Sequence, residues 1–248
     1  MLRAFLIAGR FLTRLPLPDP GAVSGPDLGR SLAFYPLLGV VIGLLVWVTG
    51  RLLVASGFPS IDLAAVLVLV AWVWLTGGMH LDGLADTADA WIGGLGDRSR
   101  TLEIMKDPRS GPFAVMALVL VLLCKWTAIT ELMGRGAMVS LVWIPALARV
   151  QLPIVFLTTP YLRPKGMGSD VAAYLGPVDT WSGAALVLAL SWLFLGRQVI
   201  FLALATAMVF LLWRQSMMVR LGGFTGDTAG ALVELSEALM LVTAVPLE

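Results

Sequence analysis

The chain has 248 residues, of which 58% are hydrophobic and 13% are charged, and 17 basic residues nearly balance 16 acidic ones. This composition excludes an ordinary soluble globular domain, and the near-neutral charge gives no indication of nucleic-acid binding. The single cysteine, Cys124, excludes an intrachain disulfide and a thiolate metal site. We therefore expect an all-α fold, a polytopic integral membrane helical bundle that forms one domain over residues 1–248.

The N-terminal region predicts a helix at the membrane surface. Residues 2–15 interleave apolar side chains with Arg3, Arg10 and Arg14, which suits a helix in the membrane interface and does not resemble a cleaved signal peptide. Residues 16–26 hold four prolines and two glycines and predict a loop. The first membrane span is expected only after this loop.

Seven apolar runs predict membrane spans, joined by polar loops that include residues 92–111 and 158–179. The predicted spans are residues 33–54, 61–76, 112–132, 137–157, 181–195, 198–213 and 228–247. The second would reach only about 24 Å, short of a hydrocarbon core of about 30 Å, and Gly77 and Gly78 interrupt it before a short acidic helix. Short spans interrupted by glycine build binding sites in membrane proteins.

The distribution of basic residues predicts the orientation of the spans. If the N-terminus is cytoplasmic, twelve basic residues flank the cytoplasmic ends of the spans and three flank the opposite ends. The twelve are Arg3, Arg10, Arg14, Arg30, Arg98, Arg100, Lys106, Arg109, Arg163, Lys165, Arg214 and Arg220, and the three are Arg51, Arg135 and Arg197. This orientation places all the polar motifs described below on the cytoplasmic face.

The most distinctive pattern lies in residues 77–91, which hold three aspartates and the only histidine. Asp82, Asp86 and Asp89 are spaced i, i+4, i+7, so a helix presents all three carboxylates on one face. Like charges in one stripe weaken a helix, and a hard divalent cation such as Mg²⁺ relieves their repulsion. We predict that the three aspartates bind Mg²⁺; the alternative is a solvated helix face with Asp82 as its N-cap. His80 is a candidate general base, a candidate hydrogen-bond donor to a substrate phosphate, or a structural histidine near the start of the helix.

A second motif lies at residues 105–109. Lys106 and Arg109 are side chains of the kind that hold phosphate oxygens, and Asp107 stands between them. We predict a phosphate-binding role for the three residues; anchoring of a cytoplasmic loop is the alternative.

The third motif is the glycine-dense turn at residues 222–228. Backbone N–H groups near Gly226 and Thr228, at the start of a helix, would seat an anion, and Asp227 would add a metal ligand or serve as an N-cap. Glu234, one or two turns further along, is expected to line the same cavity. Intramembrane Lys125 and Arg149 are expected to pair with carboxylates such as Glu234 and Glu237.

These motifs together resemble the cobalamin synthase family, the adenosylcobinamide-GDP ribazoletransferases. The resemblance rests on H-L-D-G-L-A-D-T-A-D at 80–89, M-K-D-x-R-x-G at 105–111 and G-x-T-G-D-T at 223–228. It is supported by F-L-T-R-L-P-L-P at 11–18 and F-Y-P-L-L-G at 34–39. The matches cover most of the chain in order; Ala90 and Pro108 stand where the family commonly has glycine and serine.

The resemblance implies an enzyme of the bacterial inner (cytoplasmic) membrane that uses Mg²⁺. It would join adenosylcobinamide-GDP to α-ribazole or its 5′-phosphate and release GMP. Asp82, Asp86 and Asp89, with Asp227, would bind the metal, and Lys106 and Arg109 would hold the diphosphate. The proton of the attacking hydroxyl would pass to Asp89, Asp227 or His80. Membrane lipid and the two substrates are the expected partners, and the oligomeric state stays open.

Three other functions were weighed against this one. An intramembrane prenyltransferase would need a second acidic stripe, and a CDP-alcohol phosphotransferase would need D-G-x2-A-R; the sequence has neither. An ion-coupled transporter would use Glu234 and Glu237, but it predicts inverted repeats, which the sequence does not show.

Overall fold

The structure, a computed structural model, describes residues 1–164 and 167–247, and in this part of the chain the helices are joined by loops and there is no β-strand. The α-helices are α1 (Leu2–Leu12), α2 (Gly25–Ser31), α3 (Tyr35–Ala55), α4 (Ile61–Thr76), α5 (Met79–Gly93), α6 (Arg98–Ile104), α7 (Pro112–Gly134), α8 (Ser140–Thr158), α9 (Met167–Tyr174), α10 (Pro177–Leu195), α11 (Gln198–Leu221) and α12 (Gly226–Ala244). Lys165, counted above among the basic residues, lies outside the described residues.

The long helices confirm a polytopic membrane bundle. Five segments of the described chain are long and apolar enough to cross a membrane: Gly25–Ala55, Pro112–Gly134, Ser140–Thr158, Gln198–Leu221 and Gly226–Leu247. Helices α4 and α5, bent by 89° at their junction, form a sixth candidate as a broken span. The apolar run Trp181–Leu195 of α10 is shorter. By length and composition the structure therefore supports up to six spans, where the sequence predicts about seven.

Three short helices lie in or at the edge of segments predicted as loops, and so correct that prediction. α2 begins within residues 16–26 because Ser24 and Asp27 form a capping box around its first turn. α6 begins where the Asp97 side chain accepts a hydrogen bond from the Arg100 N–H. α9 packs on α2, where a Cβ at Gly29 would overlap the backbone of Tyr174. Each helix depends on a cap or a contact that hydropathy does not detect.

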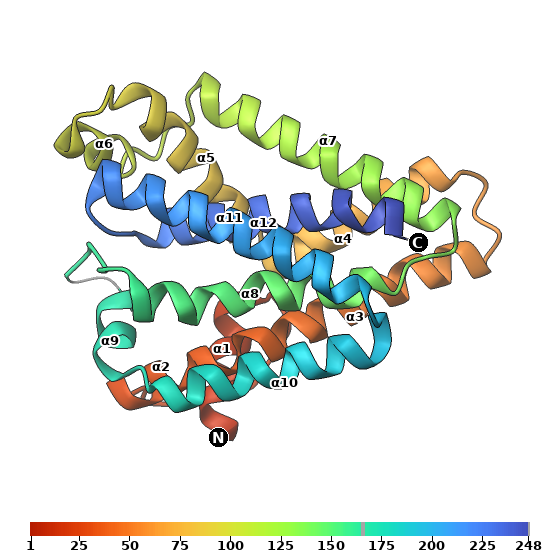
Figure 1. The fold of residues 1–248 in the computed structure, drawn as a ribbon, viewed down its shortest axis with the longest axis horizontal. Helices are drawn as coiled ribbons and strands as arrows, with labels where there is room; N and C mark the ends of the chain where they lie inside the picture. Colours follow the sequence, from red (N-terminus) through yellow and green to blue (C-terminus); the bar gives the residue numbers. More distant parts are fainter. Residues whose placement is uncertain (165–166, 248) are drawn as a thin grey trace.

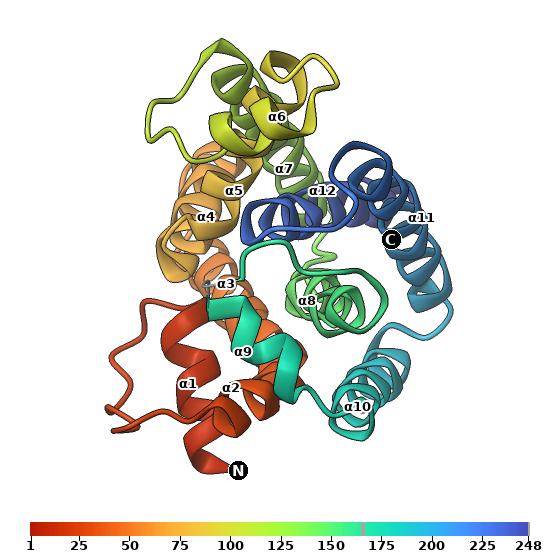
Figure 2. The same ribbon diagram turned by 90° about the vertical axis from the view of Figure 1, so that its left-hand side faces the viewer.

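Helix α8 is the centre of the bundle, with α3, α10, α11 and α12 around it (Figure 2). Its closest neighbour is α3, on which Gly39 and Gly43 face α8. A Cβ at Gly39 would lie 2.6 Å from the carbonyl oxygen of Pro145, and one at Gly43 would overlap the carbonyl oxygen of Val142. This is the small-residue contact by which membrane helices approach closely.

The long helices run back and forth along the long axis, so that their connections gather at two ends (Figure 1). One end holds α6, α9 and the turn between α11 and α12; the other holds the C-terminus and the junction of α10 and α11 (Figure 1). The three predicted motifs therefore lie at the same end, as their assignment to one face of the membrane requires.

We predict that Gly43→Val destabilises the bundle, because the new side chain meets backbone atoms of α8 that cannot move aside. Overpacking of this kind costs about 1–3 kcal/mol. Thermal unfolding in detergent measures the effect. Gly134→Ala is the control, since no atom lies within 4 Å of a Cβ at that position. Equal unfolding temperatures for the two variants would contradict the proposed packing of α3 on α8.

Candidate active site

Helix α5 carries the three aspartates on its least buried side. Asp82 is exposed and Asp86 and Asp89 are half-buried, whereas Leu84 on the other side is buried. Because α5 is continuous through all three positions, the carboxylates share the face that their spacing predicts.

Two glycines form the break before α5. Gly77 and Gly78 have φ angles of 66° and 69°, in the left-handed region that glycine adopts without strain. Arg14 lies across this break, since its N–H donates to the carbonyl oxygen of Leu75 at 2.8 Å and its guanidinium fills the space that a Cβ at Gly77 would need. The N-terminal segment is thus packed against the start of the acidic helix, a contact that sequence reasoning missed.

Helix α5 crosses α12 at very short range. A Cβ at Gly83 would lie 2.7 Å from the carbonyl oxygen of Asp227, and a Cβ at Gly230 would lie 3.2 Å from the Cα of His80. Only glycine allows the backbones to approach so closely. The crossing places Asp227 beside the acidic face of α5, where Asp82, Asp227 and Asp89 are the acidic neighbours that repel the carboxylate of Asp86.

The glycine-dense turn before α12 is fixed by its own packing. Gly222 ends α11 with a φ of 70°, and a Cβ at Gly223 would overlap the carbonyl oxygen of Pro160. Thr225 then caps α12 in a capping box with Thr228. The sequence predicts an anion seat here; the structure gives the glycines a conformational role, and the exposed N-terminus of α12 at Gly226 stays a candidate seat.

A segment from the loop after α8 pairs with this turn and supplies a basic residue. The N–H of Phe224 donates to the carbonyl oxygen of Pro160, and the N–H of Leu162 donates to that of Phe224, both at 2.9 Å. The pairing brings Arg163 to Asp227, where its Nη2 lies 2.6 Å from Oδ2. From the sequence Arg163 contributes only to the predicted orientation, and its position in a loop on the predicted cytoplasmic face is the one signal of a role at the site.

The carboxylate of Asp89 is hydrogen-bonded to backbone N–H groups of another helix. Its carboxylate accepts hydrogen bonds from the N–H of Gly111 and, at 2.9 Å, from the N–H of Ala114. Both N–H groups belong to the start of α7, so Asp89 caps that helix from a distance. The contact ties the loop at residues 105–111 to α5.

That loop presents its cations to solvent. Asp107 binds Arg109 through both oxygens, 2.9 Å from Nε and 2.6 Å from Nη2. The hydrogen bonds from the Arg109 side chain, and then from its backbone, lower the pKa of Asp107 to about 2. Since a lowered pKa keeps a carboxylate ionised above that value, this pair stays charged at every physiological pH. Lys106 is exposed, and the Arg109 side chain is 87% exposed.

Two predicted site residues lie deeper in the bundle. His80 is 4% exposed and packs beneath Gly230. Glu234 is buried and forms an ion pair with Lys125, about 10 Å along α12 from Asp227. The predicted pairing of Lys125 and Arg149 with Glu234 and Glu237 is confirmed. An ion-coupled transporter would need unpaired acidic side chains in the membrane interior, and both glutamates are paired with cations in the structure.

The acidic residues suit Mg²⁺ by their chemistry without forming a complete cage. Among the described residues, no group of three Asp, Glu, His or Cys side chains is arranged to hold a metal ion. Mg²⁺ that serves phosphate transfer usually takes one or two carboxylates and leaves its other positions to water and phosphate oxygens. Asp82 and Asp86, one turn apart on α5 and close to Asp227, fit a site of that kind.

Residues 4–245 match the model of the Cobalamin-5-phosphate synthase family. The chain belongs to this family. A relative from Pseudomonas aeruginosa named adenosylcobinamide-GDP ribazoletransferase is 50% identical over 243 residues, 97% of each chain. A relative of the same name from Pseudomonas putida is 50% identical over 96% of each chain. Another, from Ectopseudomonas mendocina, is 48% identical over 95% of this chain and 96% of the relative. No solved structure matches this member of the family.

We predict that Asp89→Ala destabilises the protein by about 0.5–2 kcal/mol, the usual cost of losing a helix cap. Asp89→Asn should cost less, since the amide oxygen still accepts one bond. Thermal unfolding in detergent gives the comparison. Asp82→Ala is the control, because the Asp82 side chain lies on the same face and makes no hydrogen bond in the described structure; it should unfold at or slightly above the native temperature, since it also removes a like charge. The capping role would be wrong if Asp89→Ala and Asp82→Ala were equally stable.

Proposed function

We propose that this protein is a Mg²⁺-dependent membrane transferase that joins adenosylcobinamide-GDP to α-ribazole or its 5′-phosphate. The products would be adenosylcobalamin or its 5′-phosphate, and GMP. The observation that carries the proposal is the set of four carboxylates on α5 and α12 at the end of the bundle that also presents Lys106, Arg109 and Arg163. The names of relatives at 48–50% identity supply the substrates.

The carboxylates would bind the metal ion, and the cations would bind the oxygens of the diphosphate. Asp82 and Asp86 would hold Mg²⁺, which supplies neutralisation of the charge on the diphosphate and on the departing GMP. Lys106 reaches into solvent and is free to bind phosphate oxygens, whereas Arg109, although exposed, would have to exchange a hydrogen bond to Asp107 for one to phosphate. Asp107 holds the Arg109 guanidinium in place until the substrate arrives.

Asp227 is the best-placed proton acceptor. Arg163 and the Thr225 hydroxyl engage its Oδ2, which leaves Oδ1 without a partner in the described structure. In the reaction a ribose hydroxyl attacks the corrinoid-side phosphorus, its proton passes to Asp227, and the bond from that phosphorus to GMP breaks. Asp89 is a poorer proton acceptor because its carboxylate already accepts two N–H hydrogen bonds. His80 is a poorer one because its side chain is buried.

The membrane arrangement follows from the same geometry. The motif-bearing end would face the cytoplasm of a bacterial cell, in the inner membrane, because the predicted excess of basic residues lies there. In this orientation the acidic face of α5 would be open to substrates on the cytoplasmic side.

The proposal is tested with the purified protein in liposomes, supplied with adenosylcobinamide-GDP and α-ribazole. Chromatography of the products should show GMP release that needs both substrates and added Mg²⁺. Chelation by EDTA should stop the release, and Mg²⁺ in excess should restore it. GMP release at the same rate with EDTA present would overturn the metal requirement, and a lack of product with all components would overturn the reaction.

We predict that Asp82→Asn and Asp86→Asn each lower kcat at least about a hundredfold, since an amide retains the shape but loses the charge that binds the cation. Asp62→Asn is the matched control, because Asp62 is an exposed aspartate in the first turn of α4 at the other end of the bundle. Insertion of each variant is checked by size-exclusion chromatography. Activity within twofold of native in either α5 variant would remove that residue from the site.

A further inference from the structure

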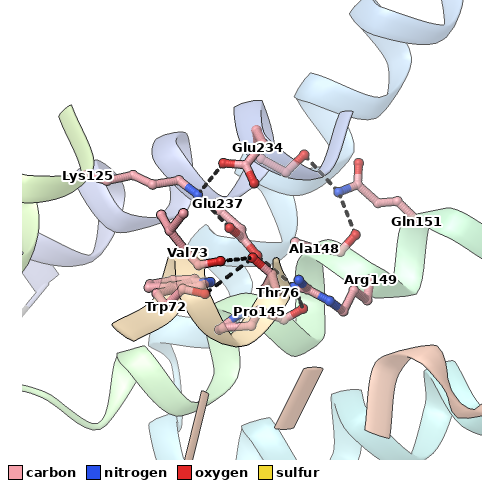
Figure 3. Close-up of polar contacts among 11 residues, drawn as sticks. Trp72, Val73, Thr76, Lys125, Pro145, Ala148, Arg149, Gln151, Glu234 and Glu237 are labelled. Atoms are coloured by element: carbon pink, nitrogen blue, oxygen red, sulfur yellow. Dashed lines mark hydrogen bonds and ion pairs between the residues drawn. The ribbon is translucent and has the colours of Figure 1, made fainter. Parts of the chain in front are cut away.

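A network of four charged side chains lies inside the bundle and joins three helices (Figure 3). Lys125 of α7 has its Nζ 2.6 Å from Glu234 Oε2 and 2.6 Å from Glu237 Oε2 on α12. Arg149 of α8 has its Nη1 2.7 Å from Glu237 Oε1 and 2.8 Å from the carbonyl oxygen of Pro145. The four side chains are at most 5% exposed, and Glu237 accepts from both cations.

This network is a poor way to gain stability. Burying charges in a membrane interior is costly, and apolar side chains of similar volume often serve as well or better. Two cations balance two carboxylates, which limits the cost without removing it. Ion pairs are directional, so a balanced set of them fixes the rotation of a helix and its position along its axis. Apolar packing fixes these two quantities less strictly.

The helix that receives these contacts is also the one that begins at the acidic site. Glu237 is ten residues after Asp227 on α12, about 15 Å along the axis. A slip of one helical turn would move Asp227 by about 5.4 Å, which is more than the width of a carboxylate site. Near its start α12 meets α5 at Gly83 and Gly230, and there the carboxylates of the two helices repel each other.

The network extends towards α5 as well. Arg149 is the principal charged neighbour of His80, which lies at the start of α5 and packs on Gly230. Gln151 of α8 adds an uncharged hydrogen bond to α12, which its Nε2 donates to the Ser236 hydroxyl at 2.8 Å. α12 is therefore held from α7 and α8 at a depth where solvent does not weaken the bonds.

We propose that Lys125, Arg149 and Glu237 are positioning residues that fix the rotation and depth of α12, and so hold Asp227 against the acidic face of α5. The requirement is for matched charge at Glu237, because only a carboxylate accepts from both cations at once. A glutamine would accept from one and present an amide N–H to the other. The kinetic part of the test rests on the proposed function; the structural part does not.

The structural test measures the distance between α5 and α12 directly. Spin labels are placed at Ile92→Cys and Gly226→Cys, both exposed, in a Cys124→Ala background that removes the exposed native thiol. Electron paramagnetic resonance in liposomes should give one narrow distance distribution, which Glu237→Gln broadens or shifts by several ångströms. Glu131→Gln, the matched change at an exposed glutamate of α7, should leave it unchanged. An unchanged distribution in Glu237→Gln would overturn the proposal.

The kinetic test uses the unlabelled variants. Glu237→Gln should lower kcat at least about tenfold while KM for adenosylcobinamide-GDP changes less than about threefold, because a displaced Asp227 affects the chemical step more than binding. If Glu237→Gln does not fold, the double variant Arg149→Met with Glu237→Met decides, since it leaves no uncompensated charge and keeps the Lys125–Glu234 pair. A normal kcat in the folded double variant would overturn the proposal. If the native protein releases no GMP, the proposed function fails while the distance measurement still decides this inference.

Discussion

The close crossing of α5 and α12 is the contact on which the site depends. It brings the backbone of Asp227 into contact with Gly83 and so places the Asp227 carboxylate beside the three carboxylates of α5. In the described structure, Arg163 is the one cation bonded to these four carboxylates. Repulsion between like charges opposes such a crossing. The glycines at 83 and 230 remove the steric barrier, and deeper in the bundle α12 packs against α7, α8 and α11.

The sequence predicted those features that depend on short-range periodicity. The i, i+4, i+7 aspartates share a face because helix geometry is local, and the long apolar runs became spans for the same reason. The pairing of Lys125 and Arg149 with Glu234 and Glu237 was also predictable, because charges in apolar segments must find partners inside the protein. Alternating span directions then brought the three motifs to one end.

Contacts between distant segments could not be predicted in this way. The hydrogen bonds of Asp89 with the N–H groups of Gly111 and Ala114 are an example, because nothing local marks these residues as its partners; its role as a metal ligand stays a prediction. Arg163 reaches Asp227 only because the loop after α8 pairs with the turn before α12. The role of Gly83 is likewise visible only when the facing backbone is known. Short helices such as α9 escaped prediction because packing, not hydropathy, supports them.

The interior network has equal numbers of cations and carboxylates, whereas the acidic cluster at the open end has more carboxylates than cations. Their surroundings explain this difference. In the interior two cations meet two carboxylates, since an unpaired charge there would be prohibitively costly. At the open end four carboxylates face one bonded arginine, and water makes the imbalance tolerable: two charges 4 Å apart interact by about 1 kcal/mol in water and about 4 kcal/mol near a protein surface. Such a cluster attracts cations from the solvent. Charge balance therefore distinguishes the interior network from the acidic cluster of the proposed site. Helix α12 contributes to both, because it carries Asp227 in the cluster and Glu237, ten residues later, in the network.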